Sequence, residues 1–147
     1  MELSFIVQGK VQAKQSARFC KIGNYIKSYQ SQNVIDYANW VKQCFLMSYP
    51  EHKAEVFKDK MLAIKTVAYF EIPKSKPKKF QEQAREGLIR PITKPDTDNI
   101  GKNIKDALNK IAFPDDSQIV TEIIEKRYSD TPRAEIFIRE VELYQPI

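Results

Sequence analysis

Alternating apolar and polar positions predict strands at the start, middle and end of this chain. From Leu3 to Gln8 every second residue is apolar, so we expect a strand with one buried face. From Met61 to Ile72 both faces carry apolar side chains, which is typical of a strand covered on both sides. The segments Gln118–Tyr128 and Ala134–Val141 are joined by a Ser-Asp-Thr-Pro turn, and we expect them to form a hairpin.

Apolar residues recurring every three or four positions predict two long helices. The first runs from Ser31, a candidate N-cap, to Ser48, and Pro50 marks its end. Trp40 lies near the apolar stripe of this helix, so we expect it to anchor the core. The second helix runs from Asn99 to Lys110.

Two shorter elements follow from turn residues. Gly23-Asn24 predicts a short hairpin between the Phe19 and Tyr25 segments. A short helix that ends at Arg85, with Gly87 as its exit, follows a lysine-rich stretch. Together the elements predict one α+β domain, residues 1–147, in which a mixed sheet packs against about two main helices.

Composition agrees with a folded globule and excludes several other classes. Hydrophobic residues make up 42% of the chain and aromatics 11%, which argues against disorder. No apolar run approaches the ~20 residues that a bilayer requires, and we expect neither a membrane span nor a signal peptide. Two cysteines, Cys20 and Cys44, make no disulfide framework, so we expect reduced thiols and a cytoplasmic protein. One histidine, His52, leaves little room for a histidine-based site.

A net charge of +5 suits a polyanionic partner, yet five aspartates fall within the 21 positions 96–116. Asp96 and Asp98 follow Pro95, which favours extended backbone, so their carboxylates are expected to share one face. Asp98 would then stand at the start of the second helix. An N-cap role explains one aspartate of this pair but not both.

The other three aspartates each have a structural alternative. Lys102 and Asp106 continue the four-residue spacing from Asp98 on the polar side of the helix, where surface ion pairs contribute at most ~1 kcal/mol each. Asp115-Asp116 precedes a strand, and neighbours in a strand face opposite sides. Only one of the two therefore points toward a common site, and the pattern leaves open which one; both also suit a turn.

Carboxylates brought together need a cation. Two of them 4 Å apart repel by about 4 kcal/mol at an effective dielectric of 20, whereas Mg²⁺ prefers such oxygen ligands. The Asp96-x-Asp98 run also begins like an EF-hand loop, but Ile100 and Ala107 occupy positions that calcium ligands would need. The acids therefore predict a Mg²⁺ site that positions a phosphate and activates water, with Lys102 stabilising negative charge.

The motif Lys94-Pro-Asp-x-Asp-Asn-x-x-Lys102-x-x-x-Asp106-Ala-Leu, followed by Asp115-Asp-Ser-Gln-Ile119, resembles the RusA family of Holliday-junction resolvases. The resemblance implies a homodimeric endonuclease, often encoded by phages or prophages, that nicks four-way DNA junctions symmetrically. It implies dependence on Mg²⁺, with Mn²⁺ as a substitute. By position, the metal-binding acids are Asp96, Asp98 and Asp116, the catalytic lysine is Lys102, and Asp106 and Asp115 are supporting acids.

The basic residues around this motif are the expected DNA contacts. The family's early loop, G-x-P-x-x-K-x-R-x-R, is matched at Gly9, Lys14 and Arg18, but Val11 replaces its proline and Ser16 an arginine. We expect phosphate contacts from six cations in this loop and in the lysine-rich stretch: Lys14, Arg18, Lys74, Lys76, Lys78 and Lys79.

Three interpretations remain open from the sequence. The first is a junction-resolving endonuclease in recombination and repair; the second is a non-catalytic nucleic-acid-binding module; the third is a nuclease for other branched DNA or RNA. Gly101 lies inside the second helix at a propensity cost of order 1 kcal/mol, and we interpret it as allowing close approach of DNA or a partner subunit.

Overall fold

The structure, a computed structural model, describes residues 1–15 and 18–142. Its centre is a four-stranded sheet in the order β1-β6-β4-β5. Strand β6 runs antiparallel to both of its neighbours, and β5 runs parallel to β4. The four strands are β1 (Glu2–Gln8), β4 (Met61–Glu71), β5 (Ile119–Ser129) and β6 (Arg133–Val141).

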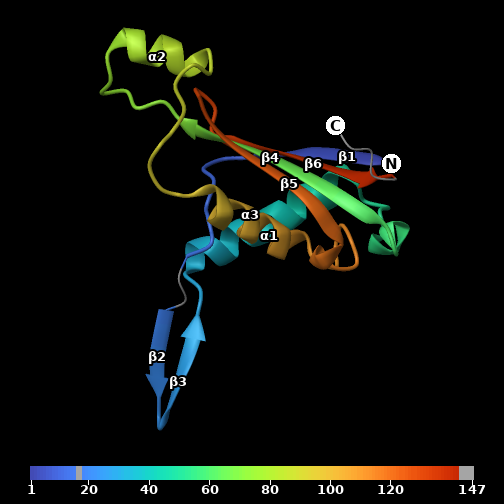
Figure 1. The fold of residues 1–147 in the computed structure, drawn as a ribbon. Coiled ribbons are helices and arrows are strands. Elements are labelled where there is room, and N and C mark those ends of the chain that lie inside the picture. The colour runs from blue at the N-terminus through green and yellow to red at the C-terminus, as the bar shows by residue number, and fades with distance from the viewer. Residues whose placement is uncertain (16–17, 143–147) are drawn as a thin grey trace.

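Two helices cover one face of this sheet, α1 (Gln32–Ser48) and α3 (Thr97–Leu108), while the short α2 (Lys78–Arg85) lies beyond the end of β4 (Figure 1). Short 3-10 helices, Ala54–Phe57 and Asp116–Gln118, precede β4 and β5. The described residues thus form a single α+β domain with a mixed sheet, which confirms the predicted fold class. Within the described ranges, no helix has both the length and the apolar character needed to cross a membrane.

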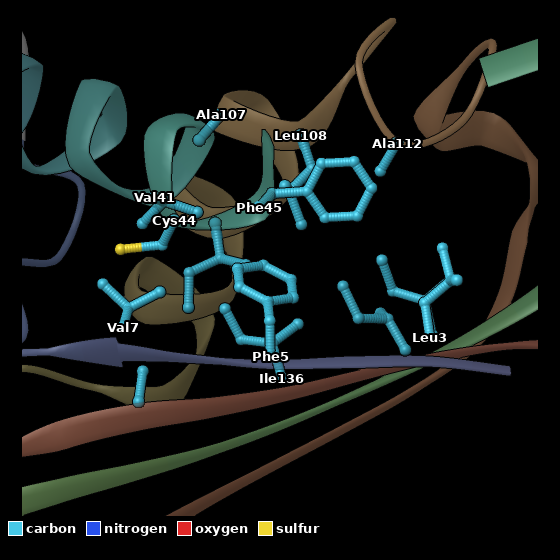
Figure 2. Packing of buried hydrophobic residues seen from close by; sticks show 14 of the residues in the cluster. Leu3, Phe5, Val7, Val41, Cys44, Phe45, Ala107, Leu108, Ala112 and Ile136 are labelled. Carbon is cyan, nitrogen blue, oxygen red and sulfur yellow. The ribbon is translucent and has the colours of Figure 1, made fainter. Parts of the chain in front are cut away.

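The core lies between the helices and the sheet (Figure 2). In β1 the inward residues Leu3, Phe5 and Val7 are buried, as their alternation predicted. Phe45 of α1 is fully buried and meets the edge of the Phe5 ring at a centroid distance of 5.3 Å. Leu108 of α3 completes the contact between the two helices and the strands. These side chains fix α3 against the sheet and leave Asp98, Lys102 and Asp106 exposed on its outer side.

The predicted hairpin of the last two strands is wrong. β5 and β6 do follow one another through a turn, but both pair with β4, which lies between them. Turn residues report only that the chain reverses, whereas strand pairing depends on long-range packing. Here β4, apolar on both faces, takes the interior position of the sheet.

Two other expectations need correction. Trp40 does not anchor the core: its side chain is 38% exposed and its indole N–H donates to the Gln8 carbonyl at 2.9 Å. Gly101 accommodates the protein's own sheet, because a Cβ there would lie 2.4 Å from Cδ1 of Ile124 and 3.0 Å from Oε2 of Glu122. The close approach at Gly101 is therefore that of α3 to β5.

The short hairpin is confirmed as β2 (Arg18–Ile22) and β3 (Tyr25–Tyr29), with Gly23 in the left-handed region at φ +60°. It forms its own two-stranded sheet and projects away from the rest of the molecule (Figure 1).

Candidate active site at the start of helix α3

The start of α3 brings Asp96 and Asp98 to one helix end. Asp96 is the N-cap, and its Oδ1 accepts the backbone N–H of Asn99 at 2.9 Å. The helix begins at Thr97, so Asp98 lies in its first turn and the expected extended segment is wrong beyond Asp96. Proline restricts only its immediate neighbours, and a cap at Asp96 starts the helix earlier than the apolar pattern indicated. Both carboxylates nevertheless lie at the positive end of the helix dipole.

Lys102 lies one turn further along the same exposed face. Its Nζ is 3.0 Å from Oδ2 of Asp98, and both side chains are largely in solvent. Asp98 raises the pKa of the Lys102 ammonium, and Asp96 and Asp106 add smaller contributions in the same direction. The site therefore holds a charged amine beside two acids.

The loop before the hairpin is tied to α3 by three contacts. Lys14 forms an ion pair with Asp106, and its backbone N–H donates to the Asn99 carbonyl at 3.0 Å. Asn103, buried among apolar neighbours, donates its side-chain N–H to the Gln12 carbonyl at 2.9 Å. Asn103 was missed by the sequence reasoning; a polar residue on the apolar side of a helix was the available signal.

These contacts border a cleft of about 580 Å³ next to Asp96. Three of its lining residues are lysines, Lys10, Lys14 and Lys94, and Phe70 at the end of β4 also lines it. A cleft with one acid at its edge and several cations around it suits a phosphate group held close to a carboxylate. The residues that line it are Lys10, Val11, Gln12, Ala13, Lys14, Gln15, Phe70, Lys94, Pro95, Asp96 and Asn99.

Asp115 and Asp116 lie at the other end of α3. The backbone N–H of Asp116 donates to Oδ1 of Asn109, just after the helix. Gln118 donates to the carbonyls of Phe57 and Lys60, next to the start of β4. A helix of 12 residues is about 18 Å long, so Asp116 and Asp96 are separated by roughly that length.

The two adjacent aspartates have different surroundings. Asp115 caps the short 3-10 helix: its carboxylate accepts the Ser117 backbone N–H at 3.1 Å and the Ser117 hydroxyl, while Gln118 accepts the Asp115 N–H at 3.1 Å. The Ser117 contacts hold the pKa of Asp115 below its usual value. Asp115 is thus engaged by its own turn, and among the described residues the Asp116 carboxylate has no hydrogen-bond partner in the structure.

One chain does not assemble the three predicted metal ligands at one point. Across residues 1–15 and 18–142, no group of three or more His, Cys, Asp or Glu side chains is arranged to hold a metal ion. A single chain supplies the acid pair of the helix start and, at the far end of α3, Asp116. These residues therefore do not fit a three-carboxylate site within one subunit.

The expected DNA-binding cations lie on two segments. Lys74, Lys76, Lys78 and Lys79 precede or begin α2, and the Lys76 ammonium lies over the Phe80 ring at 5.4 Å. Lys14 precedes the hairpin and Arg18 is its first residue; Ser16, one of the two departures from the family loop, lies outside the described residues. Figure 1 shows α2, the start of α3 and the hairpin on the same side of the molecule.

The described residues thus form an α+β domain in which two acids and a lysine lie at a helix start, beside a cleft lined by lysines. The family model of the endodeoxyribonuclease RusA matches residues 8–139, and the chain belongs to this family. It is also 41% identical over 106 residues to the uncharacterized protein YqaN of Bacillus subtilis (strain 168), which covers 71% of this chain and 75% of that protein.

Proposed function

We propose that this endodeoxyribonuclease resolves four-way DNA junctions as a homodimer in the bacterial or phage-infected cytoplasm, in recombination and repair. The grouping of Asp98 and Lys102 with Asp96, which lines a cleft together with three lysines, is the observation that carries the proposal. In the proposed reaction, Lys102 stabilises the negative charge that develops on the phosphate. The two acids orient the attacking water or the metal ion that activates this water. Membership of the family supports DNA as the substrate.

We further propose that the metal-binding set of Asp96, Asp98 and Asp116 is completed between subunits. A twofold axis crossing α3 would set two α3 helices antiparallel, so the start of each would lie near the end of the other. Each helix start would then meet the partner's Asp116, whose carboxylate is not used by its own turn. Such a carboxylate set would hold Mg²⁺, or Mn²⁺ in its place, and the bound ion would polarise a phosphate oxygen and activate water.

The cationic segments are proposed as the phosphate contacts. Lys74, Lys76, Lys78, Lys79 and Arg18 would lie along the DNA backbone. For Lys14 a phosphate contact competes with its ion pair to Asp106. We therefore propose that Lys14 also positions the loop of residues 10–15, which lines the cleft and is called the cleft loop below. Asp106 then supports the site by holding Lys14 in place, and Asp115 supports it by capping the turn that carries Asp116.

The Asp98→Asn variant tests the catalytic assignment. Cleavage of a labelled four-way junction in Mg²⁺ is expected to fall by at least about 10²-fold, while junction binding persists or tightens because a negative charge near phosphate is removed. The matched control is Asp36→Asn, an exposed aspartate of α1 bonded to Gln32, which is expected to cut at the normal rate. Normal cleavage by Asp98→Asn would reject the assignment, and binding without cleavage by the unaltered protein would favour a non-catalytic module.

A mixing experiment tests the shared site. Neither Asp98→Asn nor Asp116→Asn alone is expected to cut. In a mixed dimer, one site carries both changes and the other carries none, so one nick per junction is expected. If each site belongs to one chain, both sites of the mixed dimer are damaged and no nick appears. Mg²⁺ titration by calorimetry gives a second readout: the mixed dimer should regain half of the binding sites.

A further inference from the structure

The β2–β3 hairpin, residues 18–29 and called the arm below, exposes side chains that proteins normally bury. All five positions of each strand are exposed. Phe19, Tyr25 and Ile26 are 70%, 69% and 70% exposed, and Ile22 and Tyr29 are a little under half exposed. An isolated two-stranded hairpin is only marginally stable in water. The large exposed apolar surface of the arm therefore indicates that it contacts another molecule.

Charge indicates what kind of molecule this is. From Leu3 to Ile35 the chain contains no aspartate or glutamate, and it carries five lysines and arginines. Three of them, Arg18, Lys21 and Lys27, are on the arm itself. If the arm packed against the same segment of a second copy, its cations would be buried without acids to pair with. Burying unpaired charges costs free energy. A polyanion matches them directly.

The register places rings and cations together on both faces of the arm. Arg18 pairs with Tyr29 and Cys20 with Lys27, so these four side chains share one face. Lys21 pairs with Ile26 on the other face, next to Phe19. Interleaved rings and cations are the chemistry that holds unpaired nucleotides: bases stack on the rings and phosphates meet the cations.

The arm leaves the body beside the candidate active site. Gln30, which follows β3, lines a cavity together with Lys14 and Asp106 of the α3 face. The cleft loop precedes β2, and its Lys14 N–H is bonded to Asn99, next to Asp98. The arm is therefore joined through short protein segments to the helix start that carries the acids.

We propose that the arm recognises the branch point of DNA, with Phe19 and Tyr25 stacking on bases left unpaired there and Arg18, Lys21 and Lys27 contacting the flanking phosphates. This inference rests on the proposed function and assigns branch selectivity to the arm. Continuous duplex offers few exposed base faces, so the rings contribute little to binding it.

The test compares Phe19→Ala/Tyr25→Ala with the unaltered protein in EDTA, with fluorescence anisotropy on a labelled four-way junction and on linear duplex of equal length. Junction affinity is expected to fall about tenfold or more, and duplex affinity to stay within about twofold. 2-Aminopurine at the branch point should be quenched by the unaltered protein and not by the variant. Leu46→Ala/Met47→Ala, a pair of exposed apolar residues on α1, is the matched control and should bind both DNAs normally.

Phe19→Leu/Tyr25→Leu keeps apolar bulk and removes the rings. It should bind junctions as poorly as the alanine pair; normal binding by it, or an equal loss on both DNAs, would overturn the proposal. Conversion of the dimer to monomer in light scattering would make the arm a subunit contact instead. Binding in EDTA needs no cleavage, so an uncut junction rejects the proposed function alone, and normal binding by both arm variants rejects this inference alone.

Discussion

Gly101 shows how a single residue sets the distance between a helix and the sheet. It is buried on the side of α3 that meets β5, where Ile124 and Glu122 fill the space a side chain would need. Glu122 is itself held by Lys105 at 3.1 Å. The helix therefore accepts a poor helix former so that its start can lie close to the sheet.

Replacing Gly101 by alanine should destabilise the protein despite a gain in helix propensity. The propensity gain is of order 1 kcal/mol, whereas overpacking costs about 1–3 kcal/mol. We expect a net loss of about 1 kcal/mol in the free energy of unfolding, measured by urea denaturation. Adding Ile124→Val, which removes Cδ1, should recover most of that loss in a double-mutant cycle. A Gly101→Ala protein that is more stable than the unaltered one would show that the side chains of β5 shift at little cost in free energy.

Some contacts of the site residues could be predicted from the sequence and others could not. The pairing of Lys102 with Asp98 followed from four-residue spacing along a helix. The pairing of Asp106 with Lys14, 92 positions away, did not, because it depends on a loop that folds back onto α3. Asp115 and Asp116 could not be separated by periodicity, and the capping hydrogen bonds of Asp115 distinguish them.

At the level of elements, α2 is held to the sheet by two side-chain contacts. Arg85 donates to both carboxylate oxygens of Asp130, at 2.7 and 3.1 Å. The pair raises the pKa of Arg85 and lowers that of Asp130. Phe80 meets Tyr128 of β5 at 6.0 Å, edge to face. An eight-residue helix is marginal alone, so its order depends on this attachment.

Arg85→Gln should loosen α2 without unfolding the domain. Both partners are substantially exposed, so solvent weakens the pair and the global unfolding midpoint should change little. Hydrogen exchange in residues 78–85 should speed up measurably. Lys79→Gln removes a charge from the same helix without touching Asp130 and should leave exchange unchanged. Unaltered exchange in Arg85→Gln would mean that Phe80 alone holds the helix.

The order of the strands was the element-scale property that sequence did not predict. Each strand was recognised from its own alternation or apolar run. Within the four-stranded sheet their neighbours were not, because a parallel pair such as β4 with β5 is joined through a long connection that includes α2 and α3.

Considered whole, the molecule carries its candidate DNA contacts on one side. α2, the start of α3 and the arm all lie there, and the chain has an excess of five positive charges (Figure 1). Such an arrangement attracts a polyanion over a broad surface, with an affinity governed by counterion release.

Junction affinity should therefore fall steeply with salt. With six phosphate contacts, the binding constant is expected to drop about 10³-fold between 50 and 200 mM salt. Lys78→Gln/Lys79→Gln should reduce the slope of log K against log salt by about 2, at roughly 0.9 per contact. Lys53→Gln/Lys58→Gln, beside the 3-10 helix before β4, is the matched control and should keep the slope. A flat titration of the unaltered protein would contradict phosphate contacts by these lysines.

The amino-acid sequence by itself determined the strands and helices, the family motif and the acid and lysine spacing at the start of α3, because these depend on neighbours within a few residues. Only the tertiary structure decided that β4 separates β5 from β6, that Lys14 reaches Asp106, and that Asp116 lies a helix length from Asp96. Those relations join segments tens of residues apart, and they follow from packing the apolar faces of α1 and α3 onto one sheet. The same packing leaves Asp98 and Lys102 on the outside, where a substrate or a second subunit can reach them.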